Sequence, residues 1–167
     1  MFEEAYERAK QCDQERKQAR AEGRKLSKIH GIPCSLKDHI KYKGASSHWG
    51  HYSKLLKKSD EMNLAVQCLM KDGAIPLLKS AAPTMPALTC DNIFSGEGKN
   101  PFNFERNAGG SSGGEAGLIG GNCIPFGIGS DQAGSLRVPA SFCKVTTLCP
   151  GNDRIGLGGA NRGLLTR

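Results

Sequence analysis

Helix-forming residues dominate the start of the chain. Residues 2 to about 22 carry opposite charges four positions apart, as in Glu4 with Arg8 and Asp13 with Lys17, and such pairs stabilise a helix. Apolar positions in this stretch are few and small, so the helix is expected to lie on a surface. The pattern therefore predicts a surface helix within residues 1–24.

An extended segment follows this helix. Residues 31–38, Gly-Ile-Pro-Cys-Ser-Leu-Lys-Asp, mix apolar and polar positions. Pro33 biases the residue before it toward extended geometry, so the stretch predicts a short strand. Lys37 then lies at or near the end of that strand.

Apolar residues at helical spacing, from residue 64 to 70, predict a second helix. Ser59 or Asp60 can cap its start, and Gly73 is well placed as the C′ residue that ends it. The apolar run at 74–78 follows closely and predicts a buried strand. A helix joined this closely to a strand favours an α/β fold, in which a mixed β-sheet is flanked by helices.

The later part of the chain is rich in glycine and has less regular patterning. Residues 81–107 show no clear periodicity, and loops of that length in a compact domain are commonly functional. The small residues at 113–121 predict a closely packed helix that starts near Ser112. Residues 123–128 predict a short strand, and 129–137 predict a loop with exposed backbone.

Length and composition fit one globular domain, which we take as residues 1–167. Of these residues 38% are hydrophobic and 23% are charged, and the net charge is +7. Acids interleave with the bases near the start of the chain, without aromatic residues for base stacking, so no nucleic-acid partner is expected.

The seven cysteines form no CxxC pair, which suits reduced thiols and predicts a cytoplasmic location. No apolar run approaches the roughly 18 residues of a membrane span, and the charged start resembles no secretory segment. Peripheral association with a membrane stays open.

The segment Gly109-Gly-Ser-Ser-Gly-Gly114 contains G-x-S-x-G, the serine turn of α/β-hydrolases. In those enzymes the acid and then the histidine follow the serine. Here all four histidines precede Ser111, and residues 101–107 are a weak candidate for the strand that should lead into the turn. The hydrolase turn is therefore disfavoured.

Other short motifs also lack the context that their function needs. The sequence Gly96-Glu-Gly-Lys99 resembles a phosphate loop only loosely, and Gly127-x-Gly129 lacks the third glycine of a dinucleotide site. His48 and His51 have no evident third metal ligand. We therefore expect neither a metal nor a cofactor.

A serine hydroxyl can also be activated by a neutral lysine. Neutrality at pH 7 requires lowering the lysine pKa by roughly 3 units from about 10.4, or about 4 kcal/mol, and burial can supply this. Lys37 follows a largely apolar stretch that can desolvate it, whereas the lysines between residues 54 and 58 are expected to be solvated. A salt bridge between Lys37 and Asp38 is the structural alternative.

Four segments together resemble the amidase signature family. The resemblance covers residues 25–155, and within the family the Ser-Leu-Lys and Phe-Cys details are most similar to fatty acid amide hydrolases. The segments, in chain order, are Gly31-Ile-Pro-Cys-Ser-Leu-Lys37-Asp38, Gly73-Ala-Ile-Pro, Gly109-Gly-Ser-Ser-Gly-Gly-Glu115 and Gly129-Ser-Asp131-Gln-Ala-Gly-Ser135-Leu-Arg137-Val-Pro139-Ala.

The resemblance implies a Ser-cisSer-Lys triad that cleaves carboxylic amide bonds through an acyl-enzyme. Lys37 would be the base and later the acid, Ser111 the bridging serine after a cis peptide bond, and Ser135 the nucleophile. The substrate would be a small-molecule amide, with fatty acid amides as one class, and a homodimer stays open. The implied oxyanion-hole donors are the N–H groups of Gln132, Ala133, Gly134 and Ser135, and the implied supporting residues are Ser112, Asp131 and Arg137.

The chain departs from the family pattern at several positions. Ala133 stands where the family usually has Gly, and its Cβ requires a negative φ. The segment after Phe142 also differs at Lys144, Thr147, Cys149 and Gly151, the first two of which replace glycines.

Family domains are considerably longer than this chain, and the strands that complete their sheet would follow Arg167. We therefore expect a core that is truncated at its C-terminal side. The rival hypothesis to an amidohydrolase is accordingly an inactive or partner-dependent remnant that binds without turnover.

Overall fold

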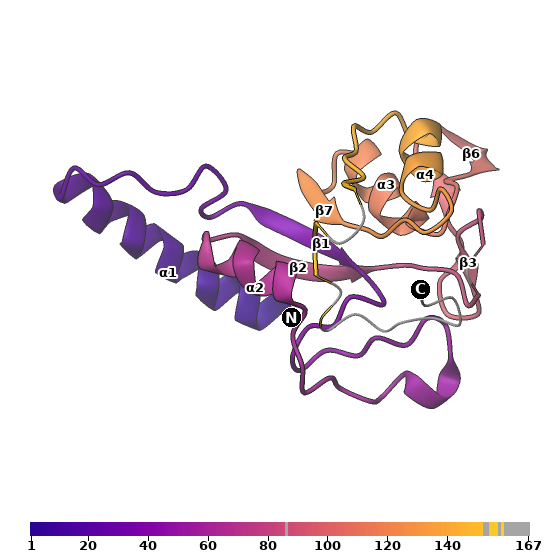
Figure 1. Ribbon diagram of the computed structural model, residues 1–167, viewed down its shortest axis with the longest axis horizontal. Coiled ribbons are helices and arrows are strands. Elements are labelled where there is room, and N and C mark those ends of the chain that lie inside the picture. The colour runs from indigo at the N-terminus through magenta and orange to yellow at the C-terminus, as the bar shows by residue number, and fades with distance from the viewer. Residues whose placement is uncertain (86, 152–153, 157, 159–167) are drawn as a thin grey trace.

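Helices cover a small parallel sheet (Figure 1). The computed structural model describes residues 1–85, 87–151, 154–156 and 158, so the expected end of the domain at 159–167 lies outside the described residues. The elements are α1 (Phe2–Ala21), β1 (Pro33–Lys37), the 3₁₀ turn η1 (Tyr52–Lys54), α2 (Leu64–Lys71), β2 (Ile75–Ser80), β3 (Asp91–Asn92), β4 (Gly96–Glu97), β5 (Lys99–Asn100), β6 (Asn103–Asn107), α3 (Gly113–Gly120), β7 (Phe126–Ile128) and α4 (Arg137–Phe142).

The main sheet has the strand order β2-β1-β7, and both pairings are parallel. The α/β class expected from the sequence is therefore confirmed. Antiparallel pairing occurs outside this sheet, in the small pairs β3 with β4 and β5 with β6. The segment 81–107, which has no clear sequence periodicity, contains these two pairs. Its last part, β6, is a strand with mostly exposed residues, so it adds no strand to the main sheet.

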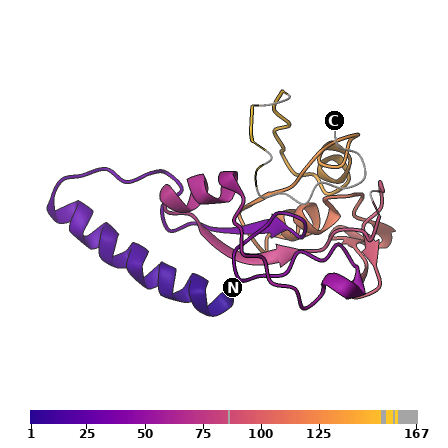
Figure 2. The same cartoon turned by 60° about the horizontal axis from the view of Figure 1, so that its bottom comes forward.

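The two faces of the main sheet are covered by different helices (Figures 1 and 2). Leu36 of β1 packs with Val66 of α2 in the largest apolar cluster. Ser35, the preceding residue, contacts Glu115 of α3 on the opposite face. Because successive side chains of a strand alternate between faces, β1 is buried from both sides.

Helix α1 is the surface helix expected near the start of the chain. Its small buried residues Ala5 and Cys12 pack against Ile75 of β2. Its C-terminal half extends beyond the sheet in both views (Figures 1 and 2). None of the helices in the described part of the chain has the length and apolarity needed to cross a bilayer.

Helix α2 begins later than the sequence predicted. Its N-cap is Asn63, whose side chain accepts the Ala65 N–H at 3.0 Å, so the prediction of Ser59 or Asp60 was wrong. The backbone of Ser59 is used elsewhere, because its N–H and carbonyl bond to the loop after β1. Gly73 does follow the helix end, with a φ of +90°, as predicted for a C′ residue.

Helix α3 starts directly after Ser112, as predicted. Its Ala116 packs with Ala108, which precedes the helix, and with Cys143, which caps the end of α4. Helix α4 ends in a Schellman turn, in which the Val145 N–H donates to the Ala140 carbonyl at 2.9 Å. These contacts fix α3 and α4 relative to each other. Each helix directly follows a glycine-containing segment, 109–112 before α3 and 129–136 before α4.

The C′ position of this Schellman turn is Lys144, whose φ is +54°. This is a position where the resemblance leads us to expect glycine, and a Cβ is strained in this conformation. Thr147, the other replacement of a glycine, has no positive φ. Of these two replacements, only Lys144 therefore has a strained backbone conformation.

We predict that Lys144→Gly is more stable than Lys144→Ala by about 1 kcal/mol, because both remove the contact of the amine with the Phe102 ring and only glycine relieves the backbone. Urea denaturation of the two variants measures the difference. Equal free energies of unfolding would contradict a strained C′ position.

Candidate active site

Lys37 ends β1 with its side chain almost fully buried, at 1% exposure. Its Nζ donates to Ser111 Oγ at 2.6 Å and to Ser130 Oγ at 3.0 Å. Ser111 lies just before α3, and the peptide bond between Gly110 and Ser111 is cis, as the resemblance implies. The parallel sheet thus brings together two of the three predicted triad residues.

Burial lowers the pKa of Lys37 to about 8, and the nearby acidic groups oppose the shift only in part. The alternative of a salt bridge with Asp38 does not hold. Asp38 instead accepts the Trp49 N–H at 2.5 Å and lies 3.6 Å from His48 Nε2. A lysine with hydroxyl partners in a dry environment can reach the neutral form near physiological pH.

Ser135 lies in the loop between β7 and α4, partly exposed. The N–H of Ser112 donates to the Ser135 carbonyl at 2.9 Å, which fastens this loop beside Ser111. In the part of the chain that the structure describes, the Ser135 hydroxyl has no hydrogen-bond partner, so Ser111 and Ser135 are neighbours without a bond between their side chains. Catalytic hydrogen bonds are often long before substrate binds.

Asp131 organises the loop that carries Ser135. Its carboxylate accepts the N–H of Gly134 at 2.8 Å and that of Leu136 at 3.1 Å. The Arg137 guanidinium adds two bonds of 3.0 Å and lowers the pKa of Asp131 well below its usual range. The side chain of Asp131 is 3% exposed, so the carboxylate serves the loop backbone and not the solvent.

Ser112 links the same loop to the start of α3. Its hydroxyl donates to the Ser130 carbonyl at 3.1 Å and accepts the Ser130 N–H at 3.3 Å. Of the three residues expected to support the loop, Ser112 and Asp131 bond to its backbone, and the Arg137 side chain bonds to the Asp131 carboxylate.

The four expected oxyanion-hole donors differ in their surroundings. The Gly134 N–H is already donated to Asp131, which takes it out of the expected set. Within the described residues, no acceptor takes the N–H of Ala133 or Ser135. Ala133 has no positive φ, so its Cβ is tolerated. Gln132 lies exposed in the same loop.

Two residues beside Lys37 were missed at the sequence level. Ser130 is the second acceptor of the lysine amine. Glu115, at 3% exposure, accepts the hydroxyls of Ser35 and Ser80. Both stand inside the family-like segments, but an acid in the first turn of a helix ordinarily indicates only a favourable helix dipole. Nothing in the sequence pattern marks Glu115 as buried.

One set of potential metal ligands occurs in the described residues. The ligand atoms of Cys12, Glu15 and His30 lie within 4.8 Å of one another. The Glu15 carboxylate already binds Arg8 at 2.6 Å and His30 at 2.6 Å, so a guanidinium supplies the positive charge there. His48 and His51 join no such cluster among the described residues.

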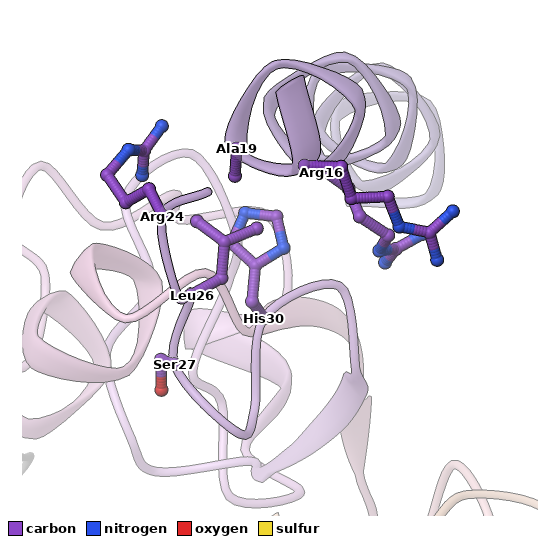
Figure 3. A pocket seen from close by; sticks show the side chains of 7 residues that line it. Arg16, Ala19, Arg24, Leu26, Ser27 and His30 are labelled. Carbon is purple, nitrogen blue, oxygen red and sulfur yellow. The ribbon is translucent and has the colours of Figure 1, made fainter. Parts of the chain in front are cut away.

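A cavity of about 220 Å³ lies between the second half of α1 and the loop before β1. Figure 3 shows Arg16 and Arg24 on either side of Leu26 and His30. A second cavity, of about 470 Å³, is lined by α1, Tyr42 and the start of β2. Neither is lined by Lys37 or by the serines near it, so the candidate active site is separate from both.

The sequence and the fold of this chain resemble those of known proteins. The family model described as Amidase matches residues 1–163. The vitamin D3 hydroxylase-associated protein of Gallus gallus is 45% identical over 76% of this chain, and fatty-acid amide hydrolase 1 of Sus scrofa is 34% identical over 78%. A crystallised chain described as fatty acid amide hydrolase has a TM-score of 0.82 and 32% identity over 95% of this chain.

This chain spans 28%, 23% and 28% of the lengths of those three relatives. The match nevertheless extends over nearly all of its own residues, in sequence and in structure. The resemblance drawn from the glycine-rich and serine-rich segments is therefore confirmed: the chain belongs to the amidase family.

Proposed function

We propose that this chain carries the catalytic machinery of a serine amidohydrolase, which cleaves carboxylic amide bonds without a histidine. The observation that carries the proposal is the 2.6 Å hydrogen bond between the buried Lys37 amine and the Ser111 hydroxyl. It joins a lysine of lowered pKa to a serine whose chain neighbour, Ser112, is bonded to the loop that carries Ser135.

The reaction begins with a proton relay. Neutral Lys37 accepts a proton from Ser111 as Ser111 accepts one from Ser135, whose oxygen bonds to the carbonyl carbon of the amide. When the carbon–nitrogen bond breaks, Ser111 returns a proton to the departing amine and regains one from Lys37. A water molecule then attacks the acyl-enzyme by the same relay and releases the carboxylic acid.

Two backbone donors are suited to the negative charge that develops on the carbonyl oxygen. The N–H groups of Ala133 and Ser135 have no acceptor among the described residues and lie in a loop held by Asp131. A preorganised donor of this kind lowers a barrier by about 3 kcal/mol.

The proposed substrates are linear amides, with fatty acid amides as the leading class. The names of the fatty acid amide hydrolases of Sus scrofa and of the crystallised chain support this class, and so does the Phe142-Cys143 detail of the sequence. The rival is a remnant that binds such amides without turnover.

We predict that a fluorophosphonate probe labels the folded chain and that Ser135→Ala abolishes the labelling, because the probe reacts with an activated serine oxygen. Ser141→Ala, which removes an exposed hydroxyl from α4, is the matched control and should label like the wild type. Gel fluorescence reads the result. A folded wild type that takes up no probe would favour the remnant.

We predict that Lys37→Met lowers the rate of amide hydrolysis by roughly 10² to 10⁴-fold, the usual contribution of a general base. Methionine fills the space of the lysine stem without a charge that must be buried, so the melting temperature should stay near that of the wild type. Hydrolysis assays and thermal melts check the two parts. Loss of folding together with activity would make Lys37 a structural residue.

We predict that kcat/KM rises about tenfold per pH unit below pH 8 and levels off above it. The folded pKa of Lys37 is lowered to about 8 by burial, so raising the pH increases the neutral, active fraction. A pH–rate profile from pH 6 to 10 measures this. A profile that falls as the pH rises through 8 would contradict a lysine base.

A further inference from the structure

A buried carboxylate lies on the sheet face that carries Lys37. Glu115 stands in the first turn of α3 and is 3% exposed. Ser35 Oγ of β1 donates to its Oε2 at 2.5 Å, and Ser80 Oγ of β2 donates to its Oε1 at 2.6 Å. Each carboxylate oxygen is thus held by a hydroxyl from a different strand, so Glu115 connects α3 to both strands.

The third strand leaves room for the same carboxylate. Gly127 of β7 pairs with Ser35 of β1, and a Cβ at Gly127 would lie 1.8 Å from Glu115 Oε2. No side chain fits there while the carboxylate is in place. Glycine is therefore required at position 127 because Glu115 occupies the space of a side chain, and not because Gly127-x-Gly129 belongs to a dinucleotide motif.

Glu115 and Lys37 share one sheet face and one end of the sheet. Lys37 lies two positions after Ser35 on β1, so both side chains point to the α3 side. Lys37 is also the register partner of Ser80 on β2. Both hydroxyls that hold Glu115 thus flank the lysine, and the two charges interact: Glu115 raises the pKa of Lys37, and Lys37 lowers that of Glu115.

We propose that Glu115 is a positioning residue that acts through Lys37: anchored on β1 and β2 by Ser35 and Ser80, its carboxylate is the buried counter-charge that stabilises the protonated lysine without bonding to it. This rests on the proposed amidohydrolase function. Burial raises the pKa of Glu115 to about 7, against the effect of its two hydroxyl donors. Because each charge affects the other, the protonation state of the carboxyl group changes the proton affinity of the lysine.

Other titratable groups also bear on this pair. They differ from Glu115 in that none of them both interacts with Lys37 and accepts hydroxyls from β1 and β2. They are Cys34 of β1, His39 in the turn after β1, Lys79 of β2, Cys90 before β3, and Asp131 of the loop after β7.

The test is the Glu115→Gln variant, which keeps the size of the side chain and removes its charge. Without the anion the protonated lysine loses stabilisation, so the midpoint of the rising limb in the pH–rate profile should fall by about one unit. Glu105→Gln removes a charge from the exposed face of β6 and should leave the midpoint unchanged. A merely structural Glu115 would lower the rate at every pH without moving the midpoint.

An NMR titration of the Lys37 ε-carbon, assigned with Lys37→Met, reads the same coupling without turnover. In the wild type the signal should show two transitions, and in Glu115→Gln one transition at lower pH. A single transition in the wild type that stays at the same pH in Glu115→Gln would overturn the proposal. If the variant does not fold, the number of transitions in the wild-type curve still tests whether Glu115 affects the lysine. A coupled titration in a protein without hydrolysis would instead refute the proposed function and leave the electrostatic link intact.

Discussion

The removal of one lysine amine from water is the constraint on which this structure depends. Lys37 stands at the end of the central strand of a parallel sheet, covered on both faces, so its ammonium form has little solvation. Two serine hydroxyls replace water as its partners. The strand ends, the start of α3 and the loop after β7 all meet at this group, and each supplies a polar atom to it or to its neighbours.

The polar contacts around the lysine join elements that are far apart in the sequence. Glu115 bonds to two strands, Ser112 bonds to the loop after β7, and Asp131 holds that loop against Arg137. Buried polar groups are costly unless they are paired, and here each of these is paired. The site is therefore preorganised by the same bonds that join the helices to the sheet.

Local sequence signals predicted the elements well where the chain is regular. The surface helix, the strand before Lys37, the end of α2 at Gly73 and the start of α3 at Ser112 agree with the structure. The start of α2 did not agree with the prediction. The N-cap is Asn63 and not Ser59, because the Ser59 backbone pairs with the loop after β1. The helix-capping propensity of a residue does not depend on hydrogen bonds to residues distant in the sequence, so it cannot predict this pairing.

The amino-acid sequence alone determined the family, the candidate triad of Lys37, Ser111 and Ser135, and the α/β order of elements. Only the tertiary structure decided that Lys37 is buried without a carboxylate bonded to it, that Ser130 is its second partner, and that Glu115 is buried. The physical reason is separation along the chain: Lys37 and Ser111 are 74 residues apart, and Ser35 and Glu115 are 80. Strand register and helix packing bring such groups together, and no local pattern encodes them.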